Sequence, residues 1–241
     1  MTELIVALDL ADPRAALALV DRLGDAVRWY KVGPMLHVAD GGGPALVRAL
    51  RERGRHVFLD LKWHDIPATV AGAVVAAREA GVALATLHLA GGARMLESAV
   101  AARGAADAGG GAPSAGALRL LGVGVLTSLD AAAYGAVVGR PVADVAVEQQ
   151  RLVRLGAAAG LDGYVSAAAE APAVRAAAGR GAIIVVPGVR RAADAAADQV
   201  RTATPGEAAA AGADFVVVGR PVTRAADPAG EARAIAAELR R

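Results

Sequence analysis

Two aspartates and two lysines stand at the ends of short apolar runs near the start of the sequence. Asp9 and Lys31 close the first two runs, and Asp60 and Lys62 close the third. If these runs are parallel strands, the carboxylates and ammoniums meet at one end and favour each other's charged forms. An ammonium held beside a reacting carbon can stabilise a carbanion and then give it a proton. A single pair would more often be a surface salt bridge, but four such groups together favour catalysis.

Lysine itself is rare in this sequence. Lys31 and Lys62 are the only two lysines, and the other 24 of the 26 basic residues are arginine. A guanidinium keeps its proton under essentially all conditions, whereas a lysine ammonium can release one. Because the composition otherwise favours arginine, we expect the two remaining lysines to be needed as lysines.

The overall composition is that of an ordinary globular protein. The 241 residues are 55% hydrophobic, carry a net charge of +2 and include no cysteine. The lack of cysteine excludes disulfides, thiol nucleophiles and cysteine zinc sites, and the four histidines show no metal-binding spacing such as HxH or HExxH. With 3% aromatic residues and no basic run, nucleic-acid binding is not expected. The acidic N-terminus lacks signal-peptide features and no apolar stretch could span a bilayer, which predicts a cytoplasmic protein without membrane contact.

Eight short apolar runs alternate with longer alanine-rich segments of helical pattern. Runs that are apolar throughout are typical of parallel strands covered on both faces. The predicted strands are Leu4–Leu8, Val27–Val32, His56–Leu61, Ala83–His88, Leu120–Leu126, Asp162–Val165, Ala182–Val186 and Asp214–Val218. This pattern indicates a single (β/α)8 TIM barrel, an α/β fold, forming one catalytic domain over residues 1–241 with its active site at the carboxyl ends of the strands.

The segments between the predicted strands supply the helices. The candidates include Pro13–Leu23, Gly43–Arg53, Ala68–Ala80, Arg94–Ala106, Val142–Ala159 and Gly206–Ala211. A doubly wound open sheet is the alternative fold, but it usually has a glycine-rich turn after its first strand, and here that strand leads into Asp9. The low-complexity stretch Gly104–Gly116 is expected to be a surface connection.

Two glycine–arginine pairs follow the last two predicted strands. Gly188 stands two residues before Arg190, and Gly219 directly precedes Arg220. TIM barrels often bind phosphate through these two loops. Glycine lets backbone N–H groups approach oxygens closely, and arginine offers a planar fork of donors. The two pairs together predict a phosphate site.

These segments resemble those of the orotidine 5'-phosphate decarboxylase family. The segment VFLDLKWHDIPATV is similar to the family's DxKxxD signature, here Asp60, Lys62 and Asp65. Other matching segments follow in the family's order along nearly the whole chain: ALDL at 7–10, YKVG at 30–33, LTS at 126–128, VPGVR at 186–190, DQVR at 198–201 and VVVGRPV at 216–222. The resemblance implies decarboxylation of orotidine 5'-phosphate to uridine 5'-phosphate, the last step of UMP biosynthesis, with no cofactor and no metal.

The resemblance also implies roles for the charged residues. Lys62 would donate the proton to C6 of the pyrimidine, and Asp60 would lie beside the substrate carboxylate. Lys31 and Asp9 would complete the array and bind the ribose hydroxyls.

Further contacts are implied outside this array. Asp65, Ile66 and Thr69 would reach across a homodimer interface into the partner's site. Thr127 of the LTS segment would contact the pyrimidine, with neighbouring Ser128 as the alternative.

At the phosphate end, the resemblance implies contacts from Arg190, Gly219 and Arg220. Gln199 and Arg201 of the DQVR segment would lie in or after a loop that closes over the phosphate. Of these two, Gln199 is the preferred contact.

Two alternative functions remain open. One is a sugar-phosphate decarboxylase or aldolase of the same superfamily, such as 3-keto-L-gulonate 6-phosphate decarboxylase or hexulose-phosphate synthase. Those enzymes share DxKxxD but use magnesium held by a glutamate where this chain has Lys31, and an ammonium would repel the cation. The other is a non-catalytic barrel that senses pyrimidine nucleotides. Binding alone needs no carboxylate aimed at an anionic substrate, so Asp60 and Lys62 argue for turnover.

Overall fold

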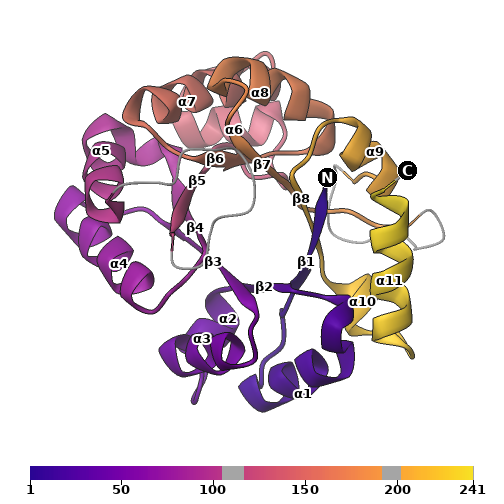
Figure 1. The fold of residues 1–241 in the computed structure, drawn as a ribbon. Coiled ribbons are helices and arrows are strands. Elements are labelled where there is room, and N and C mark those ends of the chain that lie inside the picture. Colours follow the sequence, from indigo (N-terminus) through magenta and orange to yellow (C-terminus); the bar gives the residue numbers. More distant parts are fainter. Residues whose placement is uncertain (105–116, 192–201, 241) are drawn as a thin grey trace.

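The computed structural model describes residues 1–104, 117–191 and 202–240. Within these ranges, eight parallel strands close into a barrel in which each strand pairs with the next and β8 pairs with β1 (Figure 1). The strands are β1 (Glu3–Ala7), β2 (Trp29–Val32), β3 (His56–Trp63), β4 (Leu84–His88), β5 (Arg119–Val123), β6 (Gly163–Val165), β7 (Ile183–Val186) and β8 (Phe215–Val218). The predicted (β/α)8 TIM barrel is confirmed.

The strands carry apolar side chains on both faces, because alternate residues of a strand point to opposite sides. One buried cluster consists of strand residues alone and fills the barrel interior, with Ile5, Trp29, Phe58 and Phe215 among its members. The other cluster joins the outer faces of the strands to the helices. Trp29 packs edge-on against Phe215, with ring centroids 4.9 Å apart. The barrel is therefore a packed scaffold that holds the carboxyl ends of its strands in fixed positions.

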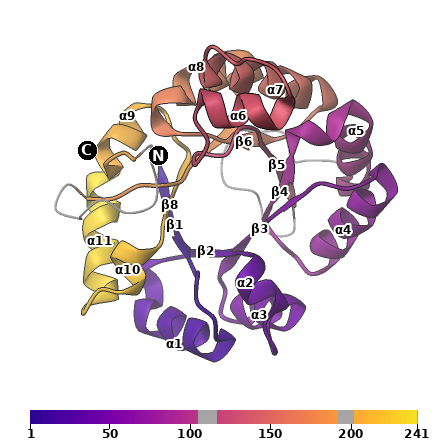
Figure 2. The same cartoon turned by 180° about the vertical axis from the view of Figure 1, so that it is seen from behind.

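Helices surround the barrel on its outside, as the two opposite views show (Figures 1 and 2). In the described residues the α-helices are α1 (Pro13–Leu23), α2 (Pro34–Val38), α3 (Gly43–Glu52), α4 (Pro67–Glu79), α5 (Gly92–Arg103), α6 (Ala131–Val138), α7 (Val145–Ala159), α8 (Ala171–Ala178), α9 (Pro205–Ala210), α10 (Arg220–Thr223) and α11 (Pro228–Glu238). Short 3-10 turns occur at Gly24–Ala26, Leu89–Gly91 and Ala168–Glu170. None of the described helices is both long enough and apolar enough to cross a membrane.

Five of these helices were not among the expected candidates. α2, α6, α8 and α10 have eight residues or fewer, so their helical period is weak in the sequence, although the equally short α9 was among the candidates. α11 is longer, but Ala232 and Ile235 are its main buried apolar residues, so its pattern is weak.

Several predicted boundaries need correction. α7 begins at Val145 rather than Val142, because the Asp144 carboxylate caps it by accepting the N–H of Ala146 at 2.8 Å. β5 ends at Val123 rather than Leu126, and β3 extends two residues beyond its predicted end. Residues 105–116 of the low-complexity stretch lie outside the described residues.

Candidate active site

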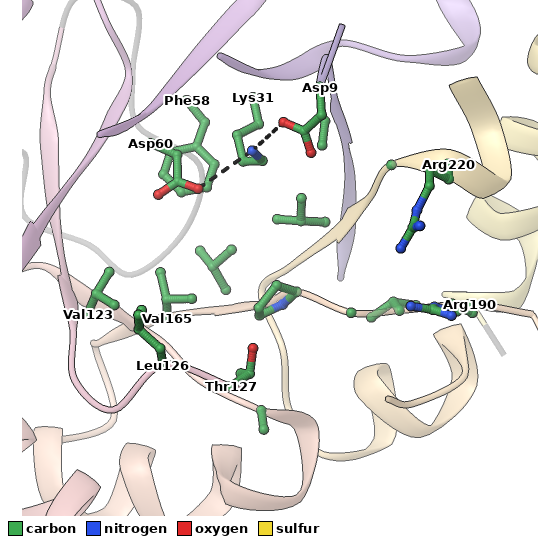
Figure 3. A pocket seen from close by; sticks show the side chains of 18 of the residues that line it. Asp9, Lys31, Phe58, Asp60, Val123, Leu126, Thr127, Val165, Arg190 and Arg220 are labelled. Carbon is green, nitrogen blue, oxygen red and sulfur yellow. Dashed lines mark hydrogen bonds and ion pairs between the residues drawn. The ribbon is translucent and has the colours of Figure 1, made fainter. Parts of the chain in front are cut away.

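A cavity of about 510 Å³ opens at the carboxyl ends of the strands. Its walls come from the ends of β1, β2, β3, β5, β6, β7 and β8 and from the loops that follow them. The volume falls in the range of sites for small molecules. Figure 3 shows charged side chains along one wall, the apolar side chains of Val123, Leu126 and Val165 on another side, and Arg190 and Arg220 away from them. The cavity is therefore divided into a charged, an apolar and a cationic part.

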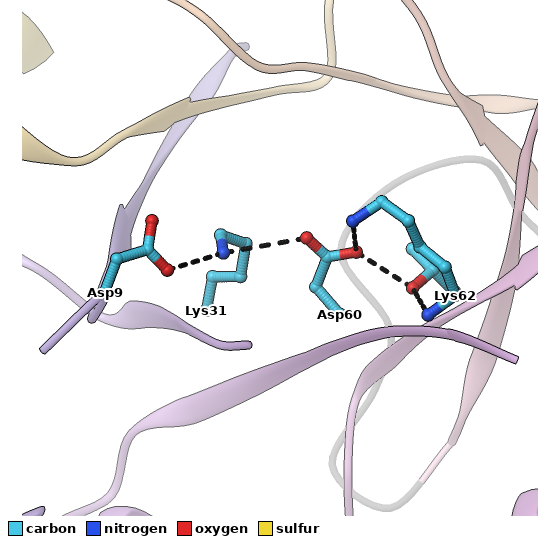
Figure 4. A network of polar contacts seen from close by, with 5 residues as sticks. Asp9, Lys31, Asp60 and Lys62 are labelled. Atoms are coloured by element: carbon cyan, nitrogen blue, oxygen red, sulfur yellow. Dashed lines mark hydrogen bonds and ion pairs between the residues drawn. The ribbon is translucent and has the colours of Figure 1, made fainter. Parts of the chain in front are cut away.

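The charged wall is a chain of alternating acids and bases (Figure 4). Lys31 Nζ lies 3.0 Å from Asp9 Oδ1 and 3.6 Å from Asp60 Oδ2. Lys62 Nζ lies 2.8 Å from the other Asp60 oxygen, Oδ1. The structure thus brings Asp9, Lys31, Asp60 and Lys62 together in that order.

Exposure differs along this chain of charges. The side chains of Lys31 and Asp60 are 12% and 13% exposed, whereas that of Lys62 is 36% exposed. All four residues line the cavity. Because Lys62 is the more open of the two ammoniums, its Nζ is the one best able to meet a bound molecule.

The ionisation of Asp60 is set by its neighbours. Burial would raise its pKa, but the Lys31 and Lys62 ammoniums and hydrogen bonds from Lys62 and Thr86 together hold the pKa below its ordinary value. Asp60 is therefore a carboxylate near neutral pH.

The backbone at Lys62 departs from a regular strand. Lys62 has φ +50°, and it is the only residue other than glycine with a positive φ in the part of the chain that the structure describes. The pairing of β3 with β4 shifts register between Leu59 and Trp63. Asp60 and Lys62 nevertheless both line the cavity, and Lys62 Nζ lies 2.8 Å from Asp60 Oδ1. Their contact is therefore made across a bulge in β3 with a left-handed residue in it rather than along a regular strand.

Two histidines stand next to this bulge. The rings of His64 and His88 stack with centroids 5.3 Å apart, and His88 Nδ1 accepts the N–H of Ala90 at 3.3 Å. Burial, followed by the nearby charges of His64 and Lys62, lowers the pKa of His88. His88 is therefore neutral near pH 7, with a structural hydrogen bond at the end of β4.

The predicted phosphate residues lie on the other side of the cavity. Gly188 and Arg190 after β7 line it, as do Gly219 and Arg220 after β8. Gly188 has φ +73°, a conformation that favours glycine. Gln199 and Arg201, the two candidates from the DQVR segment, lie outside the described residues.

Thr127 and Ser128 are separated by the geometry. Both residues border a smaller surface pocket beside α7, but of the two only Thr127 also lines the main cavity. The loop that carries Thr127 is fixed by Gln149 of α7, a residue that is 2% exposed. Gln149 Oε1 accepts the N–H of Val125 at 2.8 Å, and its Nε2 donates to the carbonyl of Val165 at 3.4 Å.

Asp65, Ile66 and Thr69 do not join the array within a single chain. All three are exposed, and none of them is among the residues that line the cavity. Asp65 Oδ1 accepts the N–H of Ile66 at 2.6 Å, and the Ile66 side chain is 66% exposed. The single chain leaves an apolar residue at the surface just beyond the array.

Two buried residues were missed by the sequence analysis. Thr86 touches both Asp60 and Lys62, and its signal in the sequence is a hydroxyl between the apolar residues Ala85 and Leu87. Gln149 gives no signal in the sequence, because its partners become neighbours only in the folded barrel.

No group of three or more His, Asp or Glu side chains within the described ranges is arranged to hold a metal ion. The acidic residues of the cavity are instead paired with lysines.

Comparisons with known proteins agree on one family. The family described as "Orotidine 5'-phosphate decarboxylase / HUMPS family" matches residues 2–235. A curated orotidine 5'-phosphate decarboxylase of Anaeromyxobacter sp. (strain K) is 51% identical over 235 residues, covering 97% of this chain and 96% of its own. A second from Moorella thermoacetica is 46% identical, covering 98% and 92%. The crystal structure of orotidine 5'-phosphate decarboxylase from Lactobacillus acidophilus superposes with a TM-score of 0.83 at 29% identity, covering both chains completely.

Proposed function

The chain belongs to the orotidine 5'-phosphate decarboxylase / HUMPS family, and on that premise we propose that it converts orotidine 5'-phosphate to uridine 5'-phosphate. This is the last step of UMP biosynthesis. The observation that carries the proposal is the alternating array of Asp9, Lys31, Asp60 and Lys62 on the cavity wall. The barrel closes between the first and last strands, which supports a single catalytic domain.

The identity of residue 31 favours this reaction over magnesium-dependent sugar-phosphate chemistry. Lys31 Nζ already lies between the carboxylates of Asp9 and Asp60. A divalent cation bound at this point would be repelled by the Lys31 ammonium, because this chain lacks the glutamate carboxylate that the magnesium enzymes have there. The curated relatives at 46% and 51% identity carry the decarboxylase name. We therefore propose a reaction that needs neither metal nor cofactor.

Lys62 is the proposed proton donor. The bond between C6 and the carboxylate breaks, carbon dioxide leaves, and the electron pair remains on C6 of the pyrimidine. The Lys62 ammonium stabilises this charge and gives its proton to form the new C–H bond. The neutral amine then regains a proton from water. The 36% exposure of the Lys62 side chain, on the cavity wall, supports this role.

Asp60 has two proposed roles. It orients the Lys62 ammonium through the 2.8 Å contact, and it lies where the substrate carboxylate would be repelled until carbon dioxide leaves. Since its pKa is held below the ordinary value, it carries its negative charge near neutral pH. Lys31 and Asp9 are proposed to bind the ribose hydroxyls.

The remaining substrate contacts follow the division of the cavity. We assign the phosphate to Arg190, Gly219 and Arg220, with Gln199 as a further contact, and the pyrimidine to the side with Thr127. Figure 3 shows Thr127 and the two arginines at different positions around the cavity, which supports a nucleotide that lies across it.

A homodimer with shared sites is also part of the proposal. Asp65, Ile66 and Thr69 are exposed, follow the array directly in the chain, and include a large apolar side chain that a partner would cover. We propose that they complete the partner's site, and that the enzyme works in the cytoplasm without nucleic-acid or membrane partners.

The test is the loss of orotidine 5'-phosphate, followed by absorbance, with purified protein in excess chelator. Lys62→Ala and Lys62→Arg serve as paired variants, since arginine keeps the charge but holds its proton. We expect chelator-resistant conversion by the wild type and no detectable turnover by either variant. If the folded wild-type protein instead binds uridine 5'-phosphate but does not turn over the substrate, the result would support the alternative function, a non-catalytic sensor of pyrimidine nucleotides.

A further inference from the structure

We propose that Thr86 is a positioning residue for this reaction: its single hydroxyl fixes the Asp60 carboxylate and the Lys62 backbone in one arrangement. The inference rests on the proposed function, because it concerns the same proton donor. Thr86 lies on β4, is fully buried, and is not among the residues that line the cavity.

Three hydrogen bonds join Thr86, Asp60 and Lys62 in a closed ring. The Lys62 backbone N–H donates to Thr86 Oγ1 at 2.9 Å, and Thr86 Oγ1 donates to Asp60 Oδ1 at 2.9 Å. Lys62 Nζ donates to the same Asp60 oxygen at 2.8 Å. A hydroxyl has one proton, and a carboxylate can only accept. The Thr86 proton must therefore point to Asp60, which leaves an oxygen lone pair for the Lys62 N–H.

The register of the sheet explains why a side chain is needed here. Leu59 pairs with Ala85 and Trp63 pairs with Leu87. Between these pairs, β3 has three residues, 60–62, and β4 has only Thr86. The backbone of one β4 residue cannot pair with the backbones of three β3 residues. The N–H of Lys62 at the bulge therefore bonds to the Thr86 hydroxyl instead.

The conformation of Lys62 also needs this support. A non-glycine residue at φ +50° is held in a disfavoured region, and such conformations persist where surrounding contacts fix them. If Thr86 lost its hydroxyl, the Lys62 N–H would lose its acceptor and the backbone could relax toward negative φ. The ammonium would then move relative to Asp60, and Asp60 would lose one of its donors.

Loss of the Thr86 hydroxyl should slow the chemical step, and so lower kcat more than it changes KM. Thr86 does not line the cavity, and its hydroxyl bonds to Asp60 and Lys62, neither of which is assigned to the ribose or the phosphate. We therefore expect Thr86→Val, which keeps the shape but removes the hydroxyl, to lower kcat about 10- to 100-fold with KM changed less than about threefold. Thr86→Ser, which keeps the hydroxyl but removes the methyl group, should stay within about threefold of the wild type. A purely structural packing role predicts the opposite ranking.

A second measurement does not depend on turnover. The chain has only two lysines, so labelling with ¹⁵N-lysine gives two backbone amide signals, from Lys31 and Lys62. We expect amide hydrogen exchange at Lys62 to accelerate at least about tenfold in Thr86→Val and to stay slow in Thr86→Ser. Lys31 on β2 is the internal reference and should change little in either variant.

The outcomes separate this inference from the proposed function. If the wild type fails to turn over the substrate, the proposed function fails, while the exchange rates still decide whether Thr86 fixes Lys62. If the wild type is active and Thr86→Val matches it in kcat, or if Lys62 exchange is unchanged in the variant, the positioning role is overturned. Should Thr86→Val not fold, Thr86→Ala removes the same hydroxyl and takes its place in both measurements.

Discussion

The side-chain oxygen of Gln149 accepts the backbone N–H of Val125 at 2.8 Å and so ties helix α7 to the loop that carries Thr127. Replacing Gln149 by leucine keeps most of the volume but leaves this N–H without its acceptor. We expect the free energy of unfolding to fall by about 1–3 kcal/mol. Because the loop loses its anchor, KM for orotidine 5'-phosphate should rise about 3- to 10-fold, more than kcat falls.

The neighbouring residue provides a matched control for this variant. Gln150 lies next on α7 and is only half-buried, so Gln150→Leu makes the same chemical change outside the loop contact. Urea unfolding and steady-state kinetics of the two variants would measure the effect. Equal changes in both would show that α7, rather than the bond to Val125, is responsible.

The Asp60 carboxylate should make stability depend on pH in a defined window. Its pKa in the folded protein lies below the ordinary value, which for aspartate is about 3.9. The ionised group therefore stabilises the fold at every pH above the unfolded pKa, and this contribution is lost as the pH falls through the lower folded pKa. Asp60→Asn has no such titration.

The measurement is the difference in unfolding free energy between the wild type and Asp60→Asn. We expect this difference to be constant from about pH 7 to pH 5 and to narrow below about pH 4. Urea unfolding at several pH values gives both quantities. A difference that stays constant down to pH 3 would contradict the lowered pKa of Asp60.

The two arginines of the cationic side should act on the phosphate alone. Arg190→Ala and Arg220→Ala are each expected to weaken uridine 5'-phosphate binding about 10- to 100-fold, since charged hydrogen bonds to phosphate are lost. Uridine, which has no phosphate, should bind all variants equally. Calorimetry with both ligands measures this, and Arg154→Ala on the exposed face of α7 is the control. A parallel loss of uridine binding would place these arginines in a structural role.

The fold was predictable because its signals are local. Continuous apolar runs marked the strands, and the residues after them marked the mouth of the barrel. Asp9, Lys31, Asp60 and Lys62 could be grouped before the structure was known, since parallel strands bring their carboxyl ends to one edge. The short helices α2 and α10 were not predicted, because their four or five residues give only a weak helical period.

The fine structure of the site depends on contacts between distant segments. Thr86 is 26 residues from Asp60, and only the register shift between β3 and β4 places its hydroxyl at the bulge. The positive φ of Lys62, which shapes its contact with Asp60, has no signal in the sequence. Gln149 likewise acts on residues 24 positions away. Spacing along the sequence carries none of this information.

The exposed segment after β3 leads to a test of the shared active site. If Asp65 serves the partner's site, each site combines Lys62 of one chain with Asp65 of the other. A heterodimer of Lys62→Ala and Asp65→Ala chains then has one site with both residues intact and one with neither. Two inactive proteins, mixed so that subunits exchange freely, should recover about a quarter of the wild-type activity, because half of the dimers are mixed and half of their sites are intact.

The matched control mixes Lys62→Ala with Asp60→Ala. These two residues touch within one chain at 2.8 Å, so every site of that heterodimer lacks one of them and no activity should return. Differently tagged chains allow the mixed dimers to be purified, and these should then show about half of the wild-type activity. If the Lys62→Ala and Asp65→Ala mixture stays as inactive as its parents while mixed dimers form, Asp65 acts within its own chain. The exposed position of Asp65, Ile66 and Thr69 outside the cavity would then need a different explanation.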